Sequence, residues 1–130
     1  MKITTAVILV DSQDKALEFY VEKLGFKKMN DIPMGPFRWL TVSSPEGIDG
    51  MEIFFEPTTF PPAKVYQKAR FDAGIPIFSF TTNDIQEEYG RLKRLEVVFR
   101  SEPKNMGPIF SAVFEDTCGN LIHLVQPVTS

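Results

Sequence analysis

The chain has 130 residues, of which 43% are hydrophobic and 24% are charged, and its net charge is −3. These values are typical of a soluble globular domain and exclude a mostly disordered chain. No apolar run is long enough for a transmembrane helix, and no signal-peptide pattern is present, so we expect a cytoplasmic protein with no membrane partner. Positive and negative residues are balanced in both halves, which predicts no nucleic-acid partner. The single cysteine, Cys118, excludes an internal disulfide framework.

The first half predicts a strand, a helix and three further strands. Ser12 can cap the helix, and Gly25 can end it in the left-handed conformation. Alternating or continuous apolar residues bounded by Gly and Pro predict the strands, which we place at 2–10, 26–29, 37–42 and 51–56.

The second half repeats this order after a different segment. Pro61 and Pro62 can start a short helix that runs to about Asp72 and stops at Gly74. Asp84 can cap the next helix, with Glu87 in a variant of the capping box. We place the strands of this half at 75–82, 97–100, 109–114 and 121–126, with a tight turn at 116–120. Cys118 is expected to be a turn residue on an exposed hairpin; the alternative, a nucleophile, would need a base nearby.

The two halves therefore share one element order, strand–helix–strand–strand–strand. Ser12 and Asp84 are 72 residues apart, and so are Phe37 and Ile109. We predict one domain made of module one (1–57), a connecting segment (58–74) and module two (75–130), with the α+β fold of a repeated βαβββ unit. Whether the connecting segment acts as a lid stays open.

Four stretches in this order resemble the vicinal oxygen chelate superfamily, which contains glyoxalases, bleomycin-resistance proteins, fosfomycin-resistance enzymes and extradiol dioxygenases. They are 16–20 with 23–26, 83–85, 102–103 with 106–108, and 114–122. The resemblance implies two βαβββ modules that form curved mixed sheets around a cleft, and a homodimer. Glu96 departs from the glycine that the family usually has after its second helix.

The resemblance also implies a divalent metal held by the first and last strand of each module. The corresponding positions are Thr5, Ile53, Ile77 and His123, with Ile53 taken as lying 70 residues before His123. A stable transition-metal site needs about three ligands from His, Cys, Asp or Glu. Only His123 qualifies, so we predict no metal and no cofactor. A one-residue change of strand register would bring in Glu52.

The same strand alternation predicts an apolar cleft for a small organic molecule of unknown identity. Its polar points are Thr5, Ser79 and His123, and Arg38 and Arg100 are alternatives for contacting an anion at the rim. We expect the ligand-binding residues to be Thr5, Val7, Trp39, Ile53, Phe55, Ile77, Ser79 and His123.

Several functions remain open, and so does the question whether the protein is an enzyme. The first is a metal-free small-molecule binding protein of the bleomycin-resistance type. The alternatives are a glyoxalase-like lyase or dioxygenase with an unorthodox metal site, a metal-independent enzyme in which His123 is the catalytic acid or base, and an interaction module without a ligand.

Overall fold

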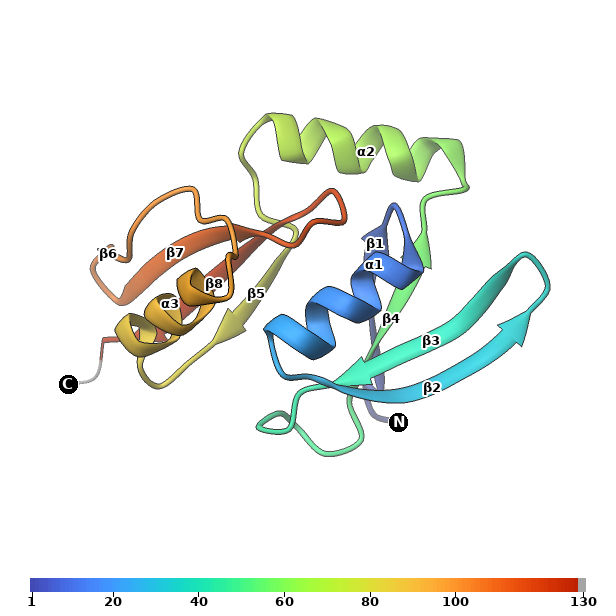
Figure 1. The fold of residues 1–130 in the computed structure, drawn as a ribbon, viewed down its shortest axis with the longest axis horizontal. Helices are drawn as coiled ribbons and strands as arrows, with labels where there is room; N and C mark the ends of the chain where they lie inside the picture. The colour runs from blue at the N-terminus through green and yellow to red at the C-terminus, as the bar shows by residue number, and fades with distance from the viewer. Residues whose placement is uncertain (129–130) are drawn as a thin grey trace. The chain divides into compact units, whose positions relative to one another are not determined.

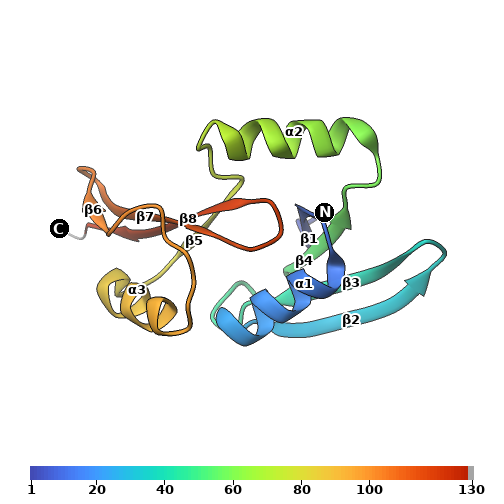
Figure 2. The same cartoon turned by 45° about the horizontal axis from the view of Figure 1, so that its top comes forward.

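The computed structural model describes residues 1–128, whose contacts divide the chain into two units, Met1–Gln67 and Lys68–Ser130. Each unit holds a four-stranded mixed sheet with a helix against it (Figures 1 and 2). The predicted α+β class and the repeated βαβββ order are confirmed. The division into one domain with a shared cleft stays a prediction, and residues 129 and 130 of module two lie outside the described part.

In the first unit, the strand order is β1-β4-β3-β2, with β1 parallel to β4 and the other neighbours antiparallel. Its helix begins where the sequence predicts, because Ser12 Oγ accepts a hydrogen bond from the backbone N–H of Lys15. The elements are β1 (Thr5–Val10), α1 (Gln13–Glu18) continuing into a π-helical turn, η1 (Phe19–Lys23), then β2 (Lys27–Met34), β3 (Phe37–Ser43) and β4 (Glu52–Pro57).

The core of this unit lies between the sheet and the α1–η1 helix. Tyr20 and Phe55 have no exposed surface, and their ring centroids are 5.0 Å apart. Gln13 joins the helix to two strands, since its Nε2 donates to the carbonyl oxygens of Arg38 (2.7 Å) and Phe55 (2.9 Å). One face of the sheet is therefore sealed by the helix. We call the opposite face of this sheet the open face.

The helix of the connecting segment is α2 (Pro61–Asp72), as predicted, and Gly74 follows it with a positive φ of 74°. Two hydrogen bonds tie this segment to β1. The backbone N–H of Thr58 donates to the Val10 carbonyl (3.1 Å), and the buried Gln67 side chain donates to the Leu9 carbonyl (3.0 Å). No helix within residues 1–128 is long and apolar enough to cross a membrane.

The second unit has the strand order β5-β8-β7-β6, with the same parallel pair at one edge. Asp84 caps its helix as predicted, accepting from the N–H of Glu87 at 3.1 Å. The predicted strand 97–100 is wrong, because that segment makes only one isolated bridge, between Phe99 and Phe114. The elements are β5 (Phe78–Thr81), α3 (Ile85–Arg94), β6 (Lys104–Asn105), β7 (Ile109–Glu115) and β8 (Leu121–Pro127).

The turn between β7 and β8 is organised by Asp116, which is fully buried. Asp116 Oδ1 accepts from the backbone N–H groups of Cys118 (2.8 Å) and Asn120 (3.1 Å), and Oδ2 accepts from the Asn120 amide (2.8 Å). Cys118 has no exposed surface, so the prediction of an exposed turn residue is wrong. The carboxylate turns the chain inward here, which buries the thiol with it.

Glu96 occupies a backbone position that favours glycine. Its φ is +67°, and it follows α3 in a Schellman motif in which Val97 N–H bonds to the Leu92 carbonyl (3.0 Å) and Glu96 N–H to the Lys93 carbonyl (3.0 Å). A left-handed conformation costs an L-residue roughly 1–2 kcal/mol. The chain holds this conformation without the residue type best suited to it.

Replacing Glu96 by glycine is therefore expected to raise the free energy of unfolding by about 0.5–1 kcal/mol, after the greater unfolded-state entropy of glycine is subtracted. The urea denaturation midpoint measures this gain. Glu96→Ala is the matched control, because it removes the carboxylate but keeps the Cβ, and no gain is expected from it. Equal gains in both variants would assign the effect to the charge and contradict the backbone explanation.

Candidate functional site

Along each strand of the first sheet, residues of the buried core alternate with residues whose side chains lie on the open face. In β4 these are Glu52, Phe54 and Glu56, because Phe54 is in register with Val7 of β1 and with Thr41 of β3, whereas Phe55 is in register with the fully buried Ile8. Paired residues of neighbouring strands project to the same side of a sheet. The predicted register of β4 is therefore wrong by one residue.

This register changes two of the predicted ligand-binding residues. Phe55 packs on Tyr20 beneath the helix, and Ile53 is paired with Ala6 on that same side. The prediction that these two residues share a face with Thr5 and Val7 is wrong. The error came from the 70-residue repeat distance. The position equivalent to His123 is Phe54, because Val7 pairs with Phe54 as Ser79, 72 residues after Val7, pairs with His123.

Aromatic rings dominate the middle of the open face. Trp39 stacks on Phe54 with ring centroids 4.5 Å apart and an interplanar angle of 23°, and Phe37 lies 6.1 Å from Phe54. Val7 and Ile32, in register with Phe54 and Trp39 respectively, are about half exposed. The predicted residues Val7 and Trp39 are thus neighbours through Phe54, which was not among the expected ligand-binding residues.

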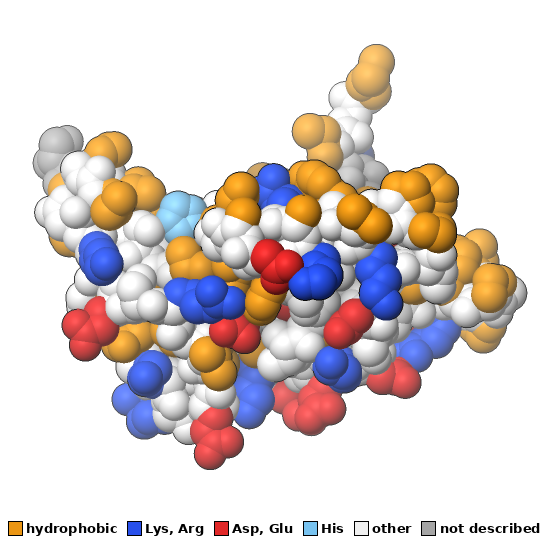
Figure 3. Space-filling model, turned by 90° about the horizontal axis from the view of Figure 1, so that it is seen from above, with side chains coloured by type: hydrophobic (Ala, Val, Ile, Leu, Met, Phe, Trp, Pro, Cys, Tyr) orange, Lys and Arg blue, Asp and Glu red, His pale blue; other side chains and the backbone are white. Residues whose placement is uncertain are grey.

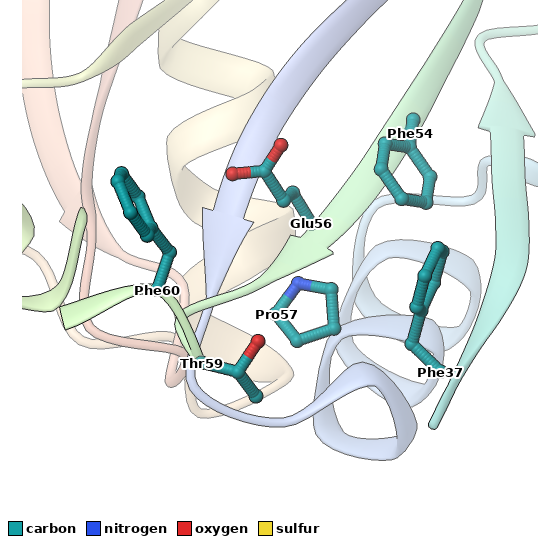
Figure 4. Close-up of a pocket in the computed structure, with 6 residues that line it drawn as sticks. All are labelled: Phe37, Phe54, Glu56, Pro57, Thr59 and Phe60. Atoms are coloured by element: carbon teal, nitrogen blue, oxygen red, sulfur yellow. The ribbon is translucent and has the colours of Figure 1, made fainter. Parts of the chain in front are cut away.

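A pocket of about 350 Å³ opens beside these rings. It is lined by Phe37, Phe54, Glu56, Pro57, Thr59 and Phe60. Figure 4 shows the Glu56 side chain between Phe60 on one side and the two rings of Phe54 and Phe37 on the other. Three aromatic rings and one carboxylate can enclose the end of a small organic molecule.

A polar cluster occupies the opposite end of β4. The Asn30 amide donates to Glu52 Oε1 at 2.8 Å and to Thr41 Oγ1 at 3.1 Å, and the Thr41 hydroxyl also donates to Glu52 Oε1. Thr5 is in register with Glu52 at the exposed edge. The three side chains satisfy one another, so they form a fixed polar boundary to the aromatic surface.

Arg38, one of the two candidates for anion binding, is held by carboxylates. Its guanidinium donates to Asp14 (2.6 Å) and to Asp31 (3.0 Å), and these hydrogen bonds raise the pKa of Arg38. The hydrogen bond from Arg38 lowers the pKa of the Asp31 carboxyl. Arg100 likewise donates to Glu115 at 2.9 Å. Both cations are neutralised within their own unit.

In the second unit, a hydrogen bond of 2.7 Å joins Ser111 Oγ and His123 Nε2. Ser79 lies in register with His123 and is exposed, and the Ile77 N–H bonds to the Leu121 carbonyl at the start of the same strand pair. A serine nucleophile needs its histidine oriented by a third group. Among residues 1–128, no carboxylate hydrogen-bonds the His123 ring, and the acid–base role of His123 stays a prediction.

The corrected repeat also changes the four positions at which a metal would be held. They are Thr5 and Phe54 in the first unit, and Ile77 and His123 in the second. One imidazole with a hydroxyl and two apolar side chains does not supply a transition-metal donor set. Within the described part of the chain, no three His, Cys, Asp or Glu side chains gather to hold a metal ion. These residues do not fit the metal centre that the resemblance implies.

The predicted site residues did not include Phe37, Phe54, Glu56 or Phe60. Phe54 and Glu56 could have been found by pairing β1 with β4 directly, whereas Phe60 lies in a segment without periodicity. The Ser111–His123 contact could have been found from the antiparallel pairing of the last two strands.

Comparisons with known proteins extend over almost the whole chain. The family model "Glyoxalase/Bleomycin resistance protein/Dioxygenase superfamily" matches residues 2–124. The uncharacterized protein YurT of Bacillus subtilis (strain 168) is 55% identical over 126 residues, which cover 97% of this chain and 99% of YurT.

Two solved structures are also similar. UcmS2 has a TM-score of 0.82 and 29% identity, covering 96% of this chain and 97% of its own. TnmS3, described as an antibiotic binding protein from Streptomyces sp. CB03234, has a TM-score of 0.76 and 28% identity, with coverage of 98% and 96%.

Proposed function

Because this chain belongs to the glyoxalase/bleomycin resistance protein/dioxygenase superfamily, as its motifs predicted, we propose that it is a binding protein for a small organic molecule. The pocket beside the Trp39–Phe54 stack on the open face is the observation that carries the proposal. The similarity to TnmS3, an antibiotic binding protein, supports it. We propose binding without a metal, since only His123 among the four family positions is a strong ligand.

The ligand of this proposal is partly aromatic and lies against Phe37, Phe54 and Phe60. Phe60 is 66% exposed, although it is a large apolar side chain. Water contact with this ring is unfavourable, and a bound aromatic group removes it. Trp39 extends the contact surface beyond the pocket, and the hydrogen-bonded Asn30–Thr41–Glu52 cluster limits the ligand at the far end.

A panel of small aromatic compounds that are neutral, cationic or anionic tests this function. Trp39 is the only tryptophan in the chain, and it stacks on a lining residue, so we expect at least one compound to quench its fluorescence saturably. Phe60→Ala is expected to weaken that binding about tenfold, as the loss of a buried aromatic contact does. Ile48→Ala removes another exposed apolar side chain, outside the pocket, and is the matched control.

Binding that Phe60→Ala leaves unchanged would contradict the proposed site. The absence of saturable binding across the whole panel would contradict the proposed function.

We also propose that the protein is a cytoplasmic homodimer. Exposed apolar side chains on α2, including Val65 and Tyr66, are candidates for the contact with a second copy. Figure 3 shows hydrophobic side chains among acidic and basic ones on the face seen from above. Native mass spectrometry is expected to give twice the mass of the chain, and it reports any small molecule retained from the cell. A monomer at all concentrations would contradict the dimer and leave the binding proposal standing.

A further inference from the structure

The pocket on the open face contains a single ionisable side chain, the carboxylate of Glu56. The other lining residues are three phenylalanines, a proline and a threonine. Within the described residues 1–128, no side chain or backbone group donates a hydrogen bond to this carboxylate, and no Lys or Arg forms an ion pair with it. Glu56 is half-buried, and a carboxylate that is partly removed from water gains from a charged partner.

The neighbouring carboxylate on the same strand face is in a different state. Glu52 accepts hydrogen bonds from both Asn30 and Thr41, and it does not line the pocket. The acceptor capacity of Glu52 is therefore used within the fold, whereas that of Glu56 is available to a ligand. Arg38, a cation on the same sheet, forms its ion pairs with Asp14 and Asp31 and not with Glu56.

The aromatic rings favour a cation in the pocket, as the carboxylate does. The face of a phenyl ring carries negative electrostatic potential and attracts a cation that approaches within about 6 Å of its centre. The rings of Phe37 and Phe54 lie on one side of Glu56 and the ring of Phe60 lies on the other (Figure 4). An anionic group placed there would lie beside the Glu56 carboxylate and the three rings, and the only donor among the lining side chains is the Thr59 hydroxyl.

We propose that the ligand of this pocket is an organic cation, an aromatic or amphipathic molecule whose ammonium or amidinium-type group pairs with Glu56 while its apolar part lies along Phe54 and Trp39. This inference rests on the proposed binding function and adds the charge of the ligand. The net charge of −3 favours the approach of such a molecule.

Two dyes with the same three-ring xanthene core and opposite charge test the inference. Rhodamine 123 is a cation and fluorescein is an anion at pH 7.5, and fluorescence anisotropy reports the binding of either to the full-length protein. We expect rhodamine 123 to bind at least tenfold more tightly. Glu56→Gln is expected to weaken the binding of rhodamine 123 about tenfold, because it removes one charge-assisted contact and keeps the side-chain volume. It is not expected to weaken the binding of fluorescein.

Glu46→Gln is the matched control. It changes the net charge of the protein by the same amount, but Glu46 is exposed in the turn between β3 and β4, away from the lining residues. It is expected to leave both affinities unchanged. Circular dichroism confirms that each variant is folded, which is expected because the Glu56 side chain supports no other residue.

Three results would overturn the inference. They are fluorescein binding as tightly as rhodamine 123, a Glu56→Gln variant with unchanged affinity for rhodamine 123, and failure of both dyes to bind while a neutral compound of the panel quenches Trp39. In the last case the proposed function survives and the charge assignment fails. If no compound of any charge binds, both are wrong.

Discussion

Replacing Phe55 by alanine is expected to lower the free energy of unfolding by about 3–5 kcal/mol, the range for a large aromatic side chain removed from a packed core. Phe55 has no exposed surface, and its ring lies against Tyr20 between β4 and the helix. Natural domains are stable by only about 5–15 kcal/mol, so this variant is expected to unfold at a much lower urea concentration. The denaturation midpoint, followed by circular dichroism, measures the change.

Phe54→Ala, the adjacent position on the same strand, is the matched control. Phe54 faces the opposite side of the sheet, where its ring contacts Trp39 and Phe37 and lines the pocket. We expect a smaller loss of stability, a change in Trp39 emission and weakened ligand binding. A larger loss of stability than that of Phe55→Ala would reverse the assignment of the two faces and refute the candidate site with it.

Replacing Asp116 by alanine is expected to cost about 3 kcal/mol of stability. The buried carboxylate accepts three hydrogen bonds in the β7–β8 turn, two of them from backbone N–H groups. Hydrogen bonds to a charged group each contribute about 1.5–3 kcal/mol, and a buried donor without an acceptor is costly. The rate at which a thiol reagent labels Cys118 provides a second measurement, and we expect it to rise, because Cys118 is the only cysteine and is fully buried in this turn.

Asp116→Asn separates the charge from the geometry of the turn. It keeps an oxygen that can accept from the N–H groups of Cys118 and Asn120. We therefore expect about half of the stability loss seen with alanine, and slower labelling of Cys118 than in the alanine variant. An alanine variant with native stability and an unreactive thiol would show that the turn does not depend on this carboxylate.

Local chemistry explains why several features could be predicted from the sequence. Ser12 and Asp84 each cap the helix that follows, and Gly74 stops α2, because each of these effects depends on a side chain and the few residues next to it. The order of elements in each module followed from the same local signals. The motif at 114–122 led to the correct superfamily because the hydrogen bonds of the Asp116–Asn120 turn require particular residue types at neighbouring positions.

The faces of the strands could not be predicted with the same certainty, because a strand has two faces and a shift of one residue exchanges them. Ile53 and Phe55 were assigned to the ligand side from a repeat distance of 70. The distance that relates Phe54 to His123 is 69, and an aromatic ring lies on each face of β4, Phe54 on one and Phe55 on the other. Only the pairing with β1 and β3 resolves the ambiguity.

By itself, the sequence determined the α+β class, the repeated module and the superfamily, since these depend on local signals and their order along the chain. Of the four positions that the resemblance implies for a metal, it offered one strong ligand, His123, and the change from Ile53 to Phe54 adds no other. The tertiary structure decided which side of β4 carries the pocket, brought Phe37, Phe54 and Phe60 near Glu56, and buried Cys118. Those features depend on the pairing of strands that are distant in sequence, and the periodicity of one strand does not specify which residues of another strand it pairs with.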